Sequence, residues 1–151
     1  IKTFTQKVNW KNLDFIIIDM PPGTGDTQLT FSQDIKMDGA IIVSTPQEVA
    51  LLDVKRGIKM FDKLGVKILG LVDNMSYFLG DNGKKHNIFG EGGVKRTAEE
   101  FKKKFLGEIM IDPIVGKAAD DGMPIVELDP NNRISKIYIE LATKVKSEFI
   151  K

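Results

Sequence analysis

The chain of 151 residues is long enough for one hydrophobic core, and its 42% hydrophobic and 28% charged residues are typical of a globular domain. Its formal net charge of +1 excludes a general electrostatic attraction to nucleic acid or to anionic membranes. The absence of Cys excludes disulfides, thiolate metal ligands and a Cys nucleophile, and it agrees with a cytoplasmic location. We therefore expect one domain over residues 1–151.

The first predicted element is a strand that ends in an acidic residue. Four consecutive apolar residues, Phe15–Ile18, precede Asp19 and the turn sequence PPGTGD. A short apolar run bounded by turn residues predicts a strand, here Asp14–Asp19, that is buried on both faces of a parallel sheet. Ligands of such sheets bind beyond the carboxyl ends of the strands, where Asp19 can hold Mg²⁺ through water. Gly23 allows the backbone to approach a phosphate.

Further strands and helices alternate along the rest of the chain. Strands are predicted at Gly39–Ser44, Val66–Asn74 and Phe105–Ile111, because each is a short apolar segment bounded by turn residues. Apolar residues at three- and four-residue spacing predict helices at about 48–64 and 135–149, and capping patterns add helices at about 26–34, 93–104 and 115–121. This alternation predicts an α/β fold with a parallel sheet flanked by helices.

A long segment from Met75 to Gly93 shows no regular pattern. It contains five glycines and the sequence Lys84-Lys85-His86. Irregular segments of this length are usually functional or mobile. A single His without Cys or carboxylate at ligand spacing is expected to be solvated rather than to bind a metal.

Several motifs together resemble one family. The sequence from Asp19 to Asp26, followed by Gln28-Leu29-Thr30, is similar to the Mrp/ApbC-type P-loop ATPases, which are iron–sulfur cluster carriers of the MinD/ParA-like superfamily. Further motifs of that family occur in the same order at 45–53, 74–78, 88–93 and 122–126. The resemblance covers nearly the whole chain and implies a Rossmann-like P-loop NTPase fold.

The resemblance also implies roles for individual residues. Asp19 corresponds to the Walker-B acid that holds Mg²⁺ through water, and Gly23 to a donor to the γ-phosphate of ATP. Asn74 corresponds to a position that reads the adenine edge, and Asp112-Pro113 to the loop beside the base. The implied protein is a homodimer that binds ATP and Mg²⁺ and serves apo iron–sulfur client proteins, with no nucleic acid or membrane as partner.

Two features depart from the family. No segment has the P-loop pattern GxxxxGK[ST] or the family's double-Lys variant, so the phosphates lack their cradle. We therefore expect the chain to be the carboxyl-terminal part of a longer protein and to be inactive alone, because phosphoryl transfer depends on positioning and electrostatics. In addition, the loop Leu79–Gly83 has no Cys-x-x-Cys pair, so direct binding of an iron–sulfur cluster by this loop is doubtful.

The missing P-loop strand leaves a gap in the expected sheet. In proteins of this type it lies between the Walker-B strand and the next one. Its absence would expose unpaired backbone groups on two apolar strands. We expect either that Phe15–Ile18 pairs directly with Ala40–Val43, or that another chain supplies the missing strand.

Two other functions remain open at this stage. The chain could belong to a MinD/ParA-like positioning ATPase that binds membrane or DNA. The last predicted helix argues against a basic membrane anchor, because its lysines are interspersed with Glu140 and Glu148 beside a full apolar stripe. The third possibility is a non-catalytic, Cys-free relative that acts only through protein contacts.

Overall fold

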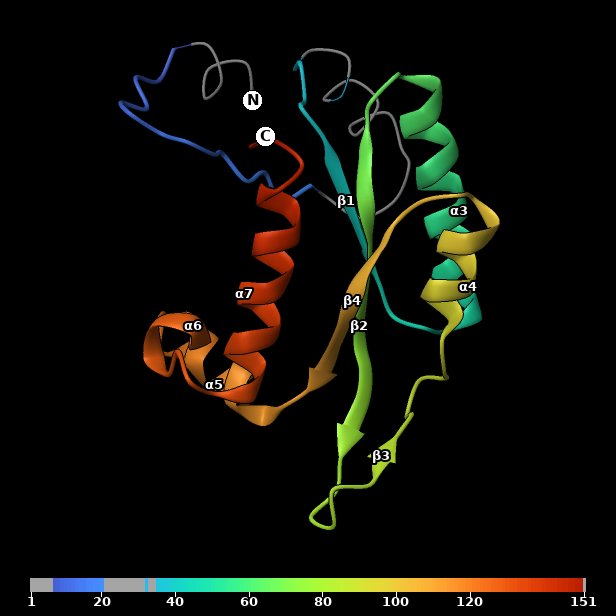
Figure 1. The fold of residues 1–151 in the computed structure, drawn as a ribbon, viewed down its shortest axis with the longest axis vertical. Helices are drawn as coiled ribbons and strands as arrows, with labels where there is room; N and C mark the ends of the chain where they lie inside the picture. The colour runs from blue at the N-terminus through green and yellow to red at the C-terminus, as the bar shows by residue number, and fades with distance from the viewer. Residues whose placement is uncertain (1–6, 21–31, 33–34, 151) are drawn as a thin grey trace.

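The computed structural model describes residues 7–20, 32 and 35–150. Within these residues the sheet has a long central strand, β2 (Ile68–Leu79), which pairs in parallel with β1 (Ala40–Ser44) and with β4 (Phe105–Ile111). The short strand β3 (Lys85–His86) pairs antiparallel with the last residues of β2. Figure 1 shows the resulting hairpin projecting beyond the rest of the molecule. The α/β class and the strands at 39–44 and 105–111 are confirmed.

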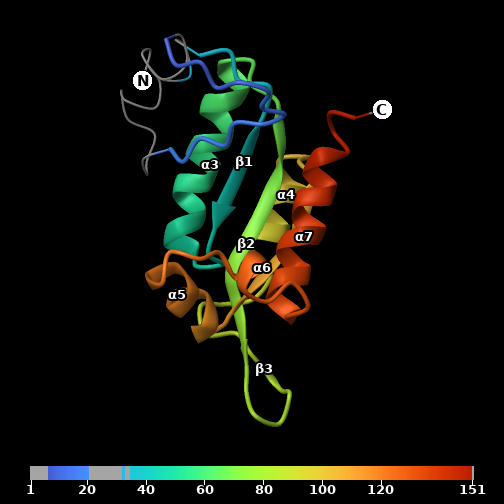
Figure 2. The same ribbon diagram turned by 90° about the vertical axis from the view of Figure 1, so that its left-hand side faces the viewer.

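Helices cover both faces of this sheet. Figures 1 and 2 show α3 (Glu48–Lys63) and α4 (Gly93–Glu100) on one face. On the other face lie α5 (Pro113–Asp120), α6 (Ile125–Leu128) and α7 (Arg133–Lys146). Consecutive residues of a strand point to opposite faces. Accordingly, Leu71 packs among residues of α3 and α4, whereas Val72 packs against α7.

The apolar spacing of α3 determines what it buries. Its four buried residues recur at three- and four-residue intervals and face the sheet: Leu51, Val54, Ile58 and Phe61. The helix ends at Leu64, and Gly65 follows with a φ of 71°, a conformation that glycine adopts without a Cβ clash. The helix predicted at about 48–64 is therefore confirmed.

The segment Asp14–Asp19 is not a strand, and this prediction was wrong. The segment has no regular structure, and Ile17 is 83% exposed. The ring of Phe15 instead packs edge-on against Phe149, which follows α7, with 5.7 Å between the ring centroids. A strand needs backbone partners, and none of the described strands pairs with this segment.

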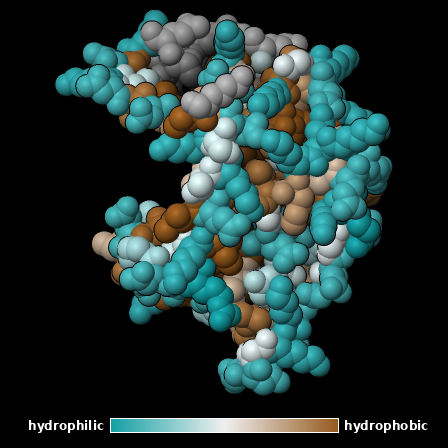
Figure 3. Space-filling model, in the orientation of Figure 1, coloured by the Kyte–Doolittle hydropathy of each residue, from teal (hydrophilic) through white to brown (hydrophobic). Residues whose placement is uncertain are grey.

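The predicted pairing of Phe15–Ile18 with Ala40–Val43 was also wrong. Among the described residues β1 pairs only with β2, so its other edge has no strand beside it. Ile41 and Val43 are 40% and 56% exposed, although a strand this apolar is typical of a sheet interior. Figure 3 shows hydrophobic surface on both sides of a hollow between segment 7–20 and the α5–α6 part of the molecule.

Two other predicted elements have different bounds. The strand predicted at Val66–Asn74 continues as β2 to Leu79, because Tyr77 and Leu79 pack against the cluster formed by α5, α6 and α7. The segment Met75–Gly93, for which no regular structure was predicted, therefore begins within β2 and contains the β2–β3 hairpin. The helix predicted at 115–121 begins earlier, at Pro113, because the Asp112 side chain caps its first turn. The helix expected near 26–34 lies outside the described residues, apart from Ser32.

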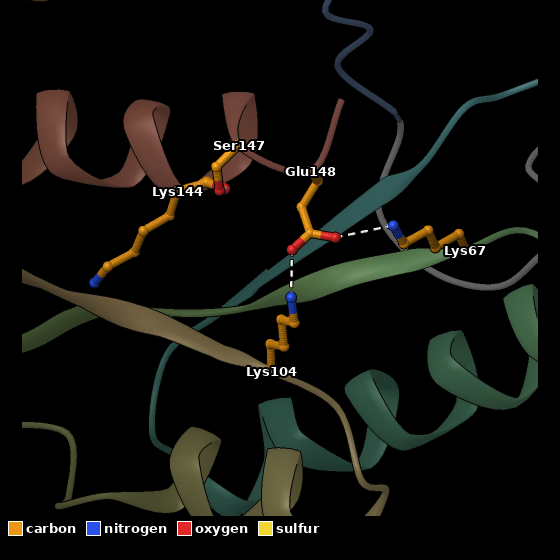
Figure 4. A network of polar contacts seen from close by, with 5 residues as sticks. All are labelled: Lys67, Lys104, Lys144, Ser147 and Glu148. Atoms are coloured by element: carbon orange, nitrogen blue, oxygen red, sulfur yellow. Dashed lines mark hydrogen bonds and ion pairs between the residues drawn. The ribbon is translucent and has the colours of Figure 1, made fainter. Parts of the chain in front are cut away.

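Glu148 joins the end of α7 to the sheet (Figure 4). Its Oε2 lies 2.9 Å from Lys67 Nζ, and its Oε1 pairs with the ammonium group of Lys104. These lysines precede β2 and β4, so both strand beginnings are tied to one carboxylate. Lys144 adds a bond from its Nζ to the Leu106 carbonyl at 2.8 Å. The hydrogen bonds from Lys104 and then Lys67 lower the pKa of Glu148 from 4.5 to about 2.

The second alternative, in which another chain supplies the missing strand, predicts that this chain self-associates. The chain should sediment as a dimer or larger species at micromolar concentration, because the open edge of β1 offers unpaired backbone groups. Val43→Lys should convert it to a monomer, whereas Val49→Lys, on the exposed face of α3, should not. A wild-type chain that is monomeric throughout would contradict this expectation.

We expect Glu148→Gln to remove a pH-dependent part of the stability. A lowered pKa in the folded state gives stability that is present above pH 4.5, the unfolded value, and is lost as the pH falls towards 2. Urea unfolding should therefore show the variant less stable than wild type at pH 7, with the difference shrinking towards pH 2. The control is Glu140→Gln, whose carboxylate pairs with Lys144 on the surface of α7. An equal effect of both substitutions would contradict the specific role of Glu148.

Candidate functional site

Residues of three adjacent parallel strands, level with the carboxyl end of β1, form the candidate site. In the register of the sheet, Asp73 of β2 lies opposite Ser44, the last residue of β1. On its other side Asp73 lies opposite Glu108 of β4, and Asn74 lies opposite Ile109. This end of an open parallel sheet is where ligands of α/β proteins usually bind.

Asn74 lies at a distortion of β2. Its Oδ1 accepts a hydrogen bond of 3.0 Å from the backbone N–H of Met75. Met75 has a φ of 54°, which is unusual for a residue other than glycine, and the register of β2 against β4 shifts between Asn74 and Phe78. Strained backbone of this kind is found mostly at functional sites. The predicted strand Val66–Asn74 would place Asn74 at its carboxyl end. In the structure Asn74 lies within β2, at the irregular position, because the strand continues to Leu79.

Asp112 and Pro113 connect β4 to α5 at the same edge of the sheet. The Asp112 Oδ1 accepts a bond of 3.0 Å from the N–H of Ile114, and Pro113 occupies the first turn of α5, where a missing N–H costs nothing. Ile109 of β4 is the partner of Asn74, and Asp112 comes three residues after it, about 10 Å along the strand direction. The structure therefore brings Asn74, Asp112 and Pro113 to one end of the sheet.

The structure does not bring Asp19 to that group. Asp19 is exposed and belongs to no strand. Phe15, four residues earlier, contacts Phe149 beside the Glu148 cluster, at the amino-terminal ends of β2 and β4. Figure 1 likewise shows segment 7–20 beside the end of α7. Gly23 lies outside the described residues, so its role stays a prediction, as does that of Asp19.

Asp73 is a buried acid that the sequence analysis did not single out. Its residue is only 1% exposed, and neither carboxylate oxygen has a hydrogen-bond partner among the described residues. Burial, and after it the charge of Glu108, raises the pKa of Asp73 from 3.8 to about 6. The available signal was an acid directly after the run from Ile68 to Val72 and inside the strand predicted at Val66–Asn74, since isolated buried acids cost free energy and are often functional.

Polar groups gather at one end of the sheet only. Asn74 and Asp112 place an amide and a carboxylate there. Asp19 lies apart from them, and the sequence contains no P-loop. In the described ranges, no group of three or more His, Asp or Glu side chains is arranged to hold a metal ion.

Comparison with known families gives one match over most of the chain. A family model described as the NUBPL iron-transfer P-loop NTPase, within the ParA group, matches residues 1–146. The chain is 48% identical over 142 residues to an iron–sulfur protein required for NADH dehydrogenase, mitochondrial, from Arabidopsis thaliana, covering 93% of this chain and 45% of that protein. It is 43% identical to the iron–sulfur cluster carrier protein of Aquifex aeolicus, covering 97% and 40%. The chain thus spans less than half the length of these relatives.

Solved structures agree with the fold. A nucleotide-binding protein from Archaeoglobus fulgidus in complex with ADP matches with a TM-score of 0.72 and 43% identity, covering 80% of this chain and 50% of that one. The septum site-determining protein MinD of Pyrococcus horikoshii, complexed with Mg-ADP, has the same TM-score of 0.72 at 23% identity, covering 92% and 53%. The second likeness shows the fold alone.

We expect Asp73→Asn to stabilise the chain at alkaline pH. A raised pKa in the folded state means that stability is complete below pH 3.8 and declines as the pH rises through about 6. At pH 8 the variant should gain about 1–3 kcal/mol in urea unfolding, because it removes the cost of ionising a buried carboxyl whose pKa is raised, and at pH 4 the gain should vanish. Asp81→Asn, in the exposed turn of the hairpin, serves as the control. A gain independent of pH would contradict the assignment.

Proposed function

Because the chain belongs to the family of NUBPL iron-transfer P-loop NTPases, we propose that it is part of an ATP-dependent carrier of iron–sulfur clusters. The observation that carries this proposal is the match over residues 1–146, together with relatives that are named iron–sulfur cluster carriers. The cluster is then the cargo of the protein, and apo iron–sulfur proteins are its clients.

The proposed role of this chain is to supply part of a nucleotide site. Asn74 would read the adenine edge, with Asp112 and Pro113 beside the base. This assignment is supported by their common position at the carboxyl-terminal edge of the sheet. Asp19 would hold Mg²⁺ through water and Gly23 would donate to the γ-phosphate, once segment 14–19 pairs as a strand in the complete protein. The P-loop would come from the part of the protein that the 151 residues do not contain.

The proposal includes a homodimer in the cytoplasm. The dimer and the location are carried over from the family resemblance of the sequence motifs. Among the described residues, no helix is long and apolar enough to cross a membrane.

A positioning ATPase of the MinD/ParA type is the second candidate, because MinD structures share the fold. A membrane-binding member would need a free amphipathic helix. In α7 the apolar stripe that includes Ile137, Leu141 and Val145 packs on the sheet, so this helix is docked on its own domain. The packing of α7 therefore favours the cluster carrier over a membrane-binding positioning ATPase. A non-catalytic relative that acts through protein contacts is the third candidate, and it differs from the first in having no ATPase activity.

We expect this chain alone not to bind nucleotide. Titration calorimetry with ATP and Mg²⁺ should show no binding, because Asn74 and Asp19 contact only the margins of the site. In the full-length protein, Asp19→Ala should reduce ATP hydrolysis at least about 100-fold without changing the folded state, whereas Asp14→Ala should retain activity. Micromolar affinity of the isolated chain would contradict the first expectation. Retained turnover of Asp19→Ala would contradict the second.

We expect this chain alone not to hold an iron–sulfur cluster. Thiolates are the usual ligands of such clusters, and the sequence has no Cys. Anaerobic reconstitution with iron and sulfide, followed by desalting, should therefore leave no charge-transfer absorbance. A stable cluster in stoichiometric amount would mean that other side chains ligate it, and His86→Ala would then be the first variant to examine.

A further inference from the structure

The turn of the β2–β3 hairpin contains the one Asn of the sequence that is followed by Gly, Asn82-Gly83. Both residues are exposed, and Gly83 has a φ of 73°. A Cβ placed on Gly83 would meet no atom within 4 Å, so the space around this residue is open. The hairpin projects from the body of the molecule in both views, so water reaches its turn (Figures 1 and 2). Glycine also leaves the backbone nitrogen unshielded and the chain free to rotate.

The side chain of Asn82 is folded back over this turn. Its Oδ1 accepts a hydrogen bond of 3.0 Å from the backbone N–H of Lys84, two residues later. Such an Asx turn places the side-chain amide over the residue between them, which is Gly83. The bond also polarises the carbonyl and stabilises negative charge that develops on Oδ1, as the N–H groups of an oxyanion hole do. The Asn82 amide is therefore held beside the Gly83 backbone with its carbon activated.

One hydrogen bond of the turn opposes an attack by the Gly83 nitrogen. The Gly83 N–H donates to the Gly80 carbonyl at 2.8 Å, and the nitrogen can react only when this bond opens. β3 has two residues and two register pairs with β2, and a hairpin of this size is marginally stable by itself. The turn can therefore open locally while the rest of the fold stays intact, which makes the reaction slow but does not prevent it.

We propose that Asn82 is a site of spontaneous deamidation, and that this modification is a slow, irreversible switch of the hairpin. The Gly83 nitrogen gives its proton to solvent base and bonds to Cγ of Asn82, and ammonia leaves with a proton taken from water. Water then hydrolyses the five-membered succinimide at either carbonyl. The products are an aspartate and an isoaspartate, and the isoaspartate adds one methylene to the main chain. The net reaction consumes one water and releases one ammonia, and it requires neither nucleotide nor cluster.

The isoaspartate product changes the spacing on which the hairpin depends. The Gly80 N–H donates to the Lys84 carbonyl at 3.0 Å, and this bond closes the turn. An added methylene between these residues shifts the register of β3 against β2. The Nζ of Lys85 then leaves its positions 3.9 Å from the centroid of the Tyr77 ring and 3.8 Å from Glu108 Oε2. The aspartate product keeps the length of the main chain and an oxygen for the Lys84 N–H, so it leaves the hairpin in place.

Incubation of the folded chain at pH 8, followed by peptide mapping with mass spectrometry, tests the chemistry. Asn82 should be converted at least about tenfold faster than Asn87, which is also exposed but is followed by Ile88, whose side chain shields the attacking nitrogen. Asn82→Gln holds its amide one methylene further away, where attack must close a larger ring, and it should stay unmodified. A protein-isoaspartate methyltransferase quantifies the isoaspartate by the methyl group that it adds. Absence of conversion at Asn82, or equal conversion at Asn87, would overturn the proposal.

A second measurement tests the switch. Backbone amide spectra compare the purified isoaspartate form, the unmodified chain and Asn82→Asp, which supplies the new charge without the added methylene. The signals of Tyr77, Lys85 and Glu108 should move in the isoaspartate form and stay near their wild-type positions in Asn82→Asp. The signal of Ile58, in the buried core, should be the same in all three and so report an intact fold. Unchanged hairpin signals in the isoaspartate form, or equal shifts in Asn82→Asp, would show that deamidation does not switch the hairpin.

Discussion

The pairing of β2 with strands on both of its edges is the constraint on which the rest of this structure depends. β2 is buried from Leu69 to Asp73 because β1 and β4 occupy its edges while helices cover its two faces. Its alternating residues then divide the molecule into two layers, with Leu71 facing α3 and α4 and Val72 facing α7. The position of the candidate site follows from this strand, since Asp73 and Asn74 both belong to it.

Two acidic residues beside β2 show what partners do to a carboxylate. Glu148, at the amino-terminal end of the strand, receives two ammonium groups, and its pKa falls to about 2. Asp73, in the middle of the strand, is buried without a hydrogen bond beside another acid, and its pKa rises to about 6. The amino-terminal end is therefore organised for stability. The middle of the strand retains a buried carboxylate without a partner and, at Met75, unusual backbone, which are features of binding sites.

The two ends of the proposed nucleotide site differ in how well this chain holds their residues in place. The residues at the base end are held by secondary structure, since Asn74 lies in β2 and Asp112 caps α5. The phosphate end depends on segment 14–19, which is apolar yet exposed and unpaired. The open edge of β1 has the same character. Both apolar segments would gain backbone partners from one additional strand.

The local pattern of apolar residues in the sequence determined most of the helices and strands. The apolar spacing of α3 and α7 and the short apolar runs of β1 and β4 predicted these elements, because side-chain periodicity is set by the geometry of the element itself. The family motifs likewise predicted site roles for Asn74 and Asp112, and these roles stay predictions. The sequence could not determine whether segment 14–19 is a strand, how far β2 extends, or that Asp73 and Lys85 lie beside Glu108. Those outcomes depend on which distant segments supply hydrogen-bond partners and packing surfaces, and only the tertiary structure decides that.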